Sequence, residues 1–305
     1  MKIVFLGVGG GMPSQIRALP AVALKLNGQI ILWDCGEGTQ MQLQRVRFSL
    51  QRITEIFISH LHGDHVLGLP GLLSSMALLR REKPLAIFGP PGIKAFVEKT
   101  LTLTHVQPEY EITTREIRRG VISRHTRYTM ECLPAIHSVP AFSFVLRIAD
   151  TPGKFNPIKA QSLGVPKGPL WKQLQLGKSV KMPAGKIIRP SQVLGPPSKG
   201  VSIAYSGDTK PNPKFAKAAH GVALLIHDAT FSMEHTEKAD EYGHSTAAQA
   251  AEIAKQAKAQ QLALVQISPR YETNEKHEKE AQEIFPKSFV PEELQIIEIV
   301  DFIRA

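Results

Sequence analysis

Four side chains that can bind metal ions lie within six positions of one another. His60, His62, Asp64 and His65 stand in the stretch "ISHLHGDHVLG", directly after the apolar, β-prone run "ITEIFI". Imidazole nitrogens and carboxylate oxygens are the usual non-sulfur ligands of zinc, and a turn at a strand's end can direct several of them to one point. The H-x-H-x-D-H pattern therefore predicts a metal site just beyond a buried strand.

Two further residues of ligand type follow apolar runs later in the chain. His137 comes after "MECLPAI" and Asp208 comes after "SIAYSG". Either residue alone could be structural, but both repeat the context of the first cluster, where sheet proteins gather active-site residues. We expect them to complete a two-metal centre.

The elements that must position these residues change in character along the chain. Early runs such as "KIVFLG", "AVALKL" and "QIILWD" are too close together for intervening helices, which predicts a mostly antiparallel or mixed sheet. Later runs, including "VSIAYSGD", "VALLIHDA" and "LALVQIS", are separated by helical segments such as "TAAQAAEIAKQAKAQ". This pattern predicts an α/β protein in which sheets are sandwiched by helices.

Composition restricts the class of protein and its partners. With 37 basic and 27 acidic residues among 305, the formal net charge of +10 favours a polyanionic partner but does not distinguish RNA, DNA and acidic membrane surfaces. No apolar run approaches a membrane span and no signal-peptide pattern is present, so we expect a cytoplasmic protein with no membrane contact. Cys35 and Cys132 lie in interior-type runs and are predicted to be small buried hydrophobes.

The segment from about residue 150 to 198 interrupts this pattern. It is dense in Pro, Gly, Lys and Arg and has few acidic residues. A solvated linker is one interpretation. The apolar "PLWKQLQL" and the local positive charge favour the other, a projecting arm that grips nucleic acid.

The motif "SHLHGDH" resembles the signature of the metallo-β-lactamase superfamily. Further blocks, in order, resemble its ribonuclease Z branch up to about residue 272: "LWDCGEGTQMQL", "GLPGLLSS", "IFGPPGIKAF", "AIHSVPAFSF", "LGPPSKG", "AYSGDT", "YGHSTAAQAAEIA" and "ISPRY". The resemblance implies a four-layer αββα fold forming a single domain over residues 1–305, with a flexible tRNA-binding arm inserted at about 150–198. It also implies a homodimer.

The same resemblance implies a reaction and a set of ligands. The enzyme would be a zinc-dependent endoribonuclease that removes 3′ extensions from precursor tRNA, leaving a 3′ hydroxyl on the tRNA and a 5′ phosphate on the trailer. Two metals suit phosphodiester hydrolysis because they can lower the pKa of a shared water and offset charge on the phosphate. By resemblance, one zinc would be held by His60, His62 and His137 and the second by Asp64 and His65, with Asp208 bridging them.

Other residues take supporting roles by resemblance. Asp64 could orient the attacking water, and Asp34 would fix the orientation of ligand histidines. His244 would give a proton to the leaving 3′ oxygen, with Asp228 as its partner on a side chain one methylene shorter than the usual glutamate. Thr246 and Gln249 could cap the helix that follows His244.

One departure from the family pattern affects the metal site. Gln266 stands where the family has a histidine that completes the second site, and an amide oxygen is a poorer zinc ligand. Three possibilities remain open: a two-metal enzyme that tolerates the change or prefers a harder ion such as Mn²⁺ or Mg²⁺, a one-metal enzyme with reduced rate, or an inactive RNA-binding relative. We favour retained activity because every other ligand position matches.

Residues that contact RNA are also implied. The loop "GMPSQIRALPA" keeps Pro13 and Arg17, which would help to position the tRNA end, while Gln15 and Ala18 replace a lysine and an asparagine of the family. In the arm, charge and location select candidate phosphate contacts, namely Lys167, Lys172, Lys178, Lys181 and Lys186. The alternatives to a tRNA-processing enzyme are a broader metallo-phosphodiesterase on the same fold and a catalytically impaired tRNA-binding protein.

Overall fold

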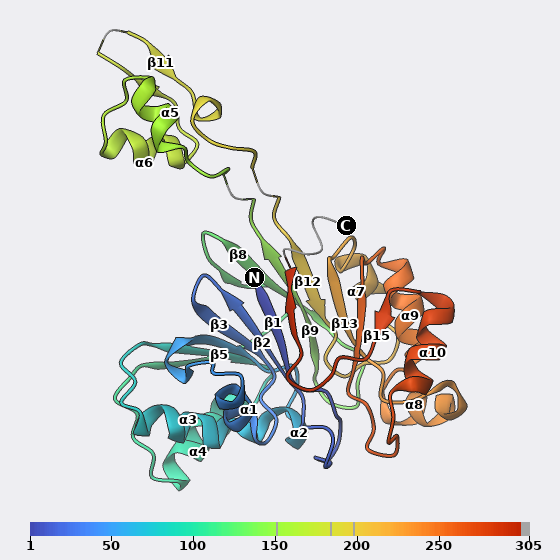
Figure 1. Ribbon diagram of the computed structural model, residues 1–305. Helices are drawn as coiled ribbons and strands as arrows, with labels where there is room; N and C mark the ends of the chain where they lie inside the picture. Colours follow the sequence, from blue (N-terminus) through green and yellow to red (C-terminus); the bar gives the residue numbers. More distant parts are fainter. Residues whose placement is uncertain (151, 184, 198, 300–305) are drawn as a thin grey trace. The chain divides into compact units, whose positions relative to one another are not determined.

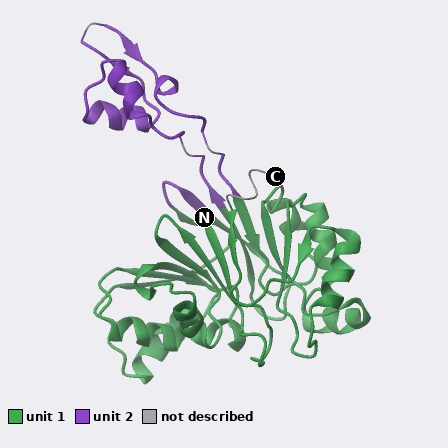
Figure 2. Cartoon of the chain, in the orientation of Figure 1, with its two compact units in different colours: residues 1–124, 130–146, 202–305 green, residues 125–129, 147–201 purple. Residues whose placement is uncertain are grey.

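The computed structural model describes residues 1–305 except 151, 184, 198 and 300–305. The chain divides into two compact units, shown in different colours in Figure 2. Unit 1 consists of the described residues of 1–124, 130–146 and 202–305, and unit 2 of those of 125–129 and 147–201. The ligand-type residues predicted from the sequence all belong to unit 1.

Seven strands form the first sheet of unit 1: β1 (Lys2–Gly7), β2 (Ala21–Leu26), β3 (Gln29–Trp33), β4 (Ile53–Phe57), β5 (Leu85–Gly89), β6 (Ile112–Glu116) and β16 (Ile296–Glu298). Their order is β16-β1-β2-β3-β4-β5-β6. The pairs β16/β1, β1/β2 and β2/β3 are antiparallel, whereas β3 to β6 are parallel. The expected mixed sheet is therefore confirmed.

The outer face of this sheet packs against helices α1 (Thr39–Arg45), α3 (Gly68–Leu78) and α4 (Ile93–Leu103). Val4 and Leu6 of β1 join Leu43, Leu72 and Val97 of the helices in one apolar cluster. Successive strand residues point to opposite faces, so Ile3 and Phe5, which are also fully buried, face away from these helices. Both faces of the strand are thus covered, which explains its continuous apolar run.

The second sheet contains β7 (Gly120–Arg124), β8 (Tyr128–Pro134), β9 (Phe142–Ile148), β12 (Ser202–Tyr205), β13 (Leu224–Asp228), β14 (Leu262–Val265) and β15 (Ser288–Phe289). The order is β15-β14-β13-β12-β9-β8-β7, and β12 to β15 are parallel. Apolar side chains of α7 (Pro213–Ala218), α9 (Ala247–Gln256) and α10 (Glu275–Ile284) cover it, among them Phe215, Ala251 and Ala281. The later βα units are as predicted.

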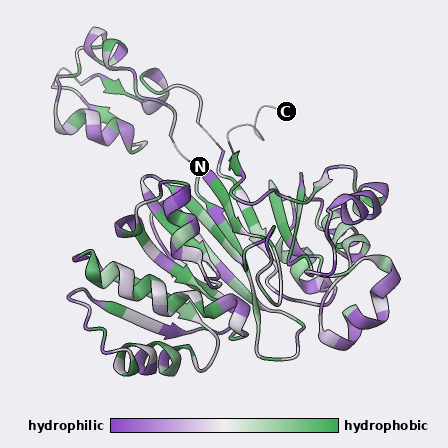
Figure 3. Ribbon diagram, turned by 60° about the horizontal axis from the view of Figure 1, so that its bottom comes forward, coloured by the Kyte–Doolittle hydropathy of each residue, from purple (hydrophilic) through white to green (hydrophobic). Residues whose placement is uncertain are grey.

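Aromatic side chains join the two sheets. The rings of Trp33 and Tyr205 stack with centroids 5.5 Å apart, and those of Phe57 and Phe144 lie 5.8 Å apart. Helices lie outside both sheets, and the strands between them are largely hydrophobic (Figures 1 and 3). The four-layer αββα fold is confirmed. The remaining elements of unit 1 are η1 (Leu50–Arg52), α2 (Gly63–Val66), η3 (Met233–His235) and α8 (Thr236–Tyr242).

Unit 2 has a small core of its own. It contains α5 (Pro157–Ser162), α6 (Pro169–Gln175), the two-stranded sheet of β10 (Val180–Lys181) and β11 (Ile187–Ile188), and η2 (Pro190–Gln192). Ala160, Leu174 and Ile188 are among its fully buried residues. The indole of Trp171, in the apolar stretch noted above, donates a hydrogen bond to the Val165 carbonyl at 2.9 Å. These contacts argue against a plain solvated linker.

The expectations about cysteines are confirmed, because Cys35 and Cys132 are free and buried and burial raises the pKa of each thiol to about 12. In the described part of the chain, no helix has both the length and the apolar character needed to cross a membrane.

A buried histidine on α10 should make the stability of the fold depend on pH. His277 is fully buried, and burial, followed by the charge of Arg17, lowers its pKa from 6.5 to about 4. The unfolded chain takes up a proton at His277 at a higher pH than the folded chain does. Lowering the pH from neutral to about 4 should therefore reduce the free energy of unfolding by up to about 3 kcal/mol.

Urea unfolding near neutral pH and near pH 4 tests this prediction. His277→Leu removes the titrating ring and should lose less stability on acidification than the native protein, whereas His220→Leu, at an exposed position, should behave like the native protein. Equal acid sensitivity of the native and His277→Leu proteins would contradict the assignment.

Candidate metal centre

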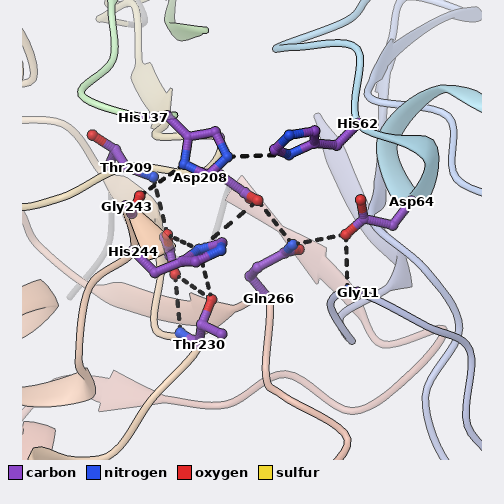
Figure 4. Close-up of polar contacts among 12 residues, drawn as sticks. Gly11, His62, Asp64, His137, Asp208, Thr209, Thr230, Gly243, His244 and Gln266 are labelled. Carbon is purple, nitrogen blue, oxygen red and sulfur yellow. Dashed lines mark hydrogen bonds and ion pairs between the residues drawn. The ribbon is translucent and has the colours of Figure 1, made fainter. Parts of the chain in front are cut away.

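Ligand-type side chains from both sheets meet at one end of unit 1. Those after β4 lie in or just before the short helix α2, and the others follow β8, β12 and β14. The structure brings together all the predicted ligand positions, which are His60, His62, Asp64, His65, His137, Asp208 and Gln266 (part of the set is drawn in Figure 4). The predicted convergence at strand ends is thus present in the structure.

Three histidine nitrogens converge in this centre. Nε2 of His60 lies 3.1 Å from Nδ1 of His62, which lies 3.2 Å from Nε2 of His137. Nitrogens bound to one tetrahedral zinc at about 2.0–2.1 Å are about 3.3 Å apart, so these spacings match a shared ion. Asp208 completes the group, and one ligand atom from each of the four residues lies within 4.8 Å of the others. The group fits a divalent metal ion.

The electrostatic environment favours the form of imidazole that binds metals. Burial, with the neighbouring His65, holds the pKa of His60 well below its ordinary value. Burial and the His137 ring lower the pKa of His62 in the same way. A neutral ring keeps a nitrogen lone pair free for a metal ion.

Hydrogen bonds aim the rings. Nδ1 of His137 donates to the Gly243 carbonyl at 2.8 Å, which leaves its Nε2 for the centre. The Ser59 hydroxyl lies 3.0 Å from Nδ1 of His60 and donates to Asp34 at 2.9 Å, so it can accept from the His60 ring. His60 therefore also presents Nε2. Such outer contacts fix both tautomer and direction of ligand histidines.

Asp34 organises the outer contacts beneath the centre. Its carboxylate lies 2.8 Å from Nδ1 of His65 and accepts hydrogen bonds from the Tyr205 hydroxyl at 2.6 Å and the Ser59 amide at 2.6 Å. It is fully buried and has a φ of 56°, a left-handed conformation that aspartate tolerates better than most residues. The geometry agrees with the orienting role that the resemblance implies for Asp34.

A second group of ligand type adjoins the first. Asp64, His65 and Asp208 have ligand atoms within 4.8 Å of one another. The amide nitrogen of Gln266 lies 3.0 Å from both carboxylates and 3.1 Å from Nε2 of His65. The oxygen and nitrogen atoms of this group are of types that bind metals. The Gln266 amide already donates hydrogen bonds to its carboxylates.

The pair of His244 and Asp228 stands beside the metal ligands. Nδ1 of His244 lies 2.8 Å from the Asp228 carboxylate and 3.8 Å from that of Asp208. Burial alone would lower the pKa of His244, but the carboxylates of Asp228 and Asp208 raise it to about 9. The shorter aspartate side chain thus still reaches the histidine, which is protonated at neutral pH.

Local structure holds this pair in place. The Asp228 carboxylate also accepts from the Thr230 amide and hydroxyl at 2.9 and 2.7 Å and from the Thr209 amide at 3.0 Å. The N-cap of helix α9, Thr246, lies two residues beyond His244. The Thr246 hydroxyl accepts from the Gln249 amide at 3.2 Å and the Gln249 side chain accepts from the Thr246 amide at 2.9 Å, so the predicted capping box is confirmed.

A cavity of about 210 Å³ opens onto the centre. Asp64, Asp208, His244 and Gln266 line it together with backbone from Gly10 and Gly11. Burial would raise the pKa of Asp64, but His65, the Gly11 amide and the Gln266 amide lower it below its ordinary value. A phosphate group in this cavity would meet a carboxylate that can accept a proton and a histidine that can donate one.

Arg17 lies apart from this cavity. Its side chain is 5% exposed and donates to the Tyr271 carbonyl at 2.6 Å and to the Asn274 side chain at 2.7 Å. The guanidinium therefore holds two loops of unit 1 together, and an RNA contact of Arg17 stays a prediction. The candidate arm residues Lys167, Lys172, Lys178, Lys181 and Lys186 are exposed in unit 2.

Several contributors to the site were missed from the sequence. Ser59, Tyr205 and Thr230 contact Asp34 or Asp228, and Gly11 and Gly243 contribute backbone groups. Ser59 and Thr230 stand in the motifs "SHLHGDH" and "HDAT". Their positions beside predicted site residues in the sequence could have identified them. The backbone contributors carry no side-chain signal.

A two-sheet αββα core with histidine and aspartate ligands at strand ends defines a protein of the metallo-β-lactamase fold. Comparison with solved structures agrees. The short form of human tRNase Z matches with a TM-score of 0.72 and 26% identity over 98% of this chain and 99% of that chain. A metallo-β-lactamase fold protein from Bacillus subtilis matches with a TM-score of 0.69 and 16% identity, over 97% of this chain and 98% of that chain, which shows the fold alone.

Curated relatives narrow the class. The ribonuclease Z of Methanosarcina acetivorans is 40% identical over 300 residues, covering 98% of both chains. That of Bacillus subtilis is 39% identical over 293 residues, covering 94% of this chain and 95% of the relative. A family model described as "Anti-Pycsar protein Apyc1" also matches residues 1–151. The chain belongs to the ribonuclease Z family, and the predicted resemblance and enzyme class are confirmed.

Proposed function

We propose that this protein is an endoribonuclease that removes 3′ extensions from precursor tRNA with a divalent metal ion, preferably zinc. The observation that carries the proposal is the convergence of His60, His62 and His137 with Asp208, beside the paired His244 and Asp228. Similarity supplies the substrate class, since the relatives are named ribonuclease Z and the similar human structure is named tRNase Z.

Different residues of the chain have different roles in the proposed reaction. The metal, when bound by the three histidines and Asp208, supplies Lewis-acid stabilisation for negative charge on the phosphoryl group. Asp64, whose pKa is lowered and which lines the cavity, would orient the attacking water and accept its proton. His244 carries a proton for the leaving 3′ oxygen. Breaking the bond between phosphorus and O3′ leaves a 3′ hydroxyl on the tRNA and a 5′ phosphate on the trailer.

The test is cleavage of an end-labelled, 3′-extended precursor tRNA with zinc, manganese or magnesium supplied. We expect cutting at the 3′ side of the tRNA, with the stated ends, and loss of cutting in Asp64→Ala. Binding without cutting under every metal would instead indicate a catalytically impaired tRNA-binding protein. Cleavage of small diesters with no gain from tRNA would indicate a broader phosphodiesterase.

Unit 2 is proposed as the tRNA-binding arm within a single domain. Five exposed lysines could neutralise backbone phosphates. Replacing all five with alanine should weaken precursor binding and lower its log–log salt slope by up to about one unit per lysine lost. Cleavage of a small diester should not change.

A filter-binding titration over a range of salt concentrations measures this slope. Lys255→Ala with Lys258→Ala, at exposed positions at the end of α9 and just beyond it, is the matched control. An unchanged slope in the arm variant would show that these lysines do not contact the substrate. We also propose that the enzyme acts in the cytoplasm and that it is a homodimer. Sedimentation of the purified protein tests the oligomeric state.

A further inference from the structure

The amide of Gln266 lies at the centre of the second group of ligand-type side chains. Its nitrogen is 3.0 Å from Oδ2 of Asp64, 3.0 Å from Oδ2 of Asp208 and 3.1 Å from Nε2 of His65 (Figure 4 shows the two carboxylate contacts). The residue is 4% exposed. It therefore occupies the space among the three side chains and does not merely border it.

The chemistry of the amide matches that of a cation at this point. An amide group has two N–H donors, one for each carboxylate, whereas its oxygen can only accept. Turning the amide would place its oxygen against the oxygens of Asp64 and Asp208 with no proton between them, so the hydrogen-bond partners assign the nitrogen to this position. The carboxylates receive from Gln266 the positive partial charge that a metal ion would otherwise provide.

An amide and a metal ion exclude each other here. Zinc lies about 2.0–2.2 Å from its oxygen and nitrogen ligands, which requires the lone pairs of Asp64, His65 and Asp208 to point at the ion. In the structure the same carboxylate oxygens accept hydrogen bonds from Gln266. The second group therefore does not fit an ion while the amide remains in place.

The surrounding backbone keeps the amide from swinging out. Gln266 has a φ of 66°, a left-handed conformation that is uncommon for glutamine. Its neighbour Ile267 donates to the Val8 carbonyl at 2.9 Å and accepts from the Gly10 amide at 3.1 Å. A Cβ at Gly10 would lie 2.7–2.9 Å from side-chain atoms of Gln266, so the backbone there closes directly over the amide.

We infer that the Gln266 amide takes the place of a second metal ion, and that the chain binds one divalent ion, at His60, His62, His137 and Asp208. The inference rests on the proposed function only in treating that ion as the catalytic one. Asp64 and His65 then support the site through hydrogen bonds instead of coordination, and the enzyme belongs to the one-metal class.

Metal analysis of the full-length protein tests this inference without reference to activity. After equilibrium dialysis against buffered zinc, mass spectrometry should find about one ion per native chain and about two per chain of Gln266→His. Histidine tolerates a positive φ better than glutamine does, so the variant should fold. Gln256→His, at an exposed position on α9, is the control for an added histidine and should hold one ion.

A second variant keeps the size of the side chain. Gln266→Glu exchanges the two donors for acceptors at the same place and should also hold two ions. Cobalt substitution gives an independent readout, since a second ion should add a new set of visible absorption bands in either variant.

The outcomes separate the inference from the proposed function. Two ions on the native chain, or one ion on both folded Gln266 variants, would overturn the inference and leave the proposed nuclease activity intact. One ion on the native chain and two on the variants would support it, even if no precursor tRNA were cut, in which case the proposed function alone would fail. A native chain without any ion would overturn both.

Discussion

Replacing Asp208 with alanine is expected to lower the rate of precursor cleavage by about a thousandfold or more and to weaken metal binding sharply. Among the described residues, Asp208 is the only one shared by all three groups that could hold a metal ion. It closes the three-histidine group, accepts a hydrogen bond from Gln266 and lies near His244. One substitution therefore removes a ligand, a hydrogen-bond acceptor and part of the charge that keeps His244 protonated.

Single-turnover cleavage and metal analysis measure the two effects together. Asp240→Ala is the matched control, because Asp240 is 77% exposed and pairs only with Lys210 among the ion pairs of the described chain. Thermal unfolding of the Asp208 variant checks that its fold is retained. A variant that keeps its metal and loses less than tenfold in rate would rule out Asp208 as a ligand.

Replacing His244 with alanine is expected to slow precursor cleavage by about a hundredfold to ten-thousandfold, the range for loss of a general acid. The loss should depend on the leaving group. An RNA 3′ oxygen is a poor leaving group and needs a proton, whereas p-nitrophenolate leaves without one. Cleavage of bis-p-nitrophenyl phosphate by the same variant should therefore be nearly unchanged.

A structural role would give a different result. If His244 only held the loop before α9 in place, both substrates would be cut more slowly by the same factor, and the proton-donor assignment would fail. Asp228→Asn provides the intermediate case, because it keeps the size of the partner and removes the charge that raises the pKa of His244. It should slow RNA cleavage less than His244→Ala does.

Local signals in the sequence were sufficient for most of the fold and for locating the candidate ligand positions. Alternation and spacing of apolar runs predicted a mixed first sheet and later βα units, and T-x-x-Q predicted the capping box of α9. The candidate ligand positions could be predicted because they come shortly after apolar strands. Strands buried on both faces are recognisable in a sequence without knowledge of their partners.

The remaining features depend on contacts between distant segments. Arg17 carries a charge and stands in a loop, which suggests an RNA contact, but its partners Tyr271 and Asn274 are more than 250 positions away. Gln266 was identified as a weaker ligand. Its hydrogen bonds to Asp64 and Asp208 depend on how the two sheets pack together, and neither propensity nor periodicity contains that information.

The pairing of the two sheets has a consequence for the order of events during synthesis. His60 and His62 come from the first sheet, whereas Asp208 and the His244 pair come from the second, and β16 joins the first sheet beside β1. A ribosome that has released only the first half of the chain has exposed histidines without their carboxylate. The proposed cleavage of tRNA would therefore begin only after the late strands have docked and brought Asp208 to the histidines.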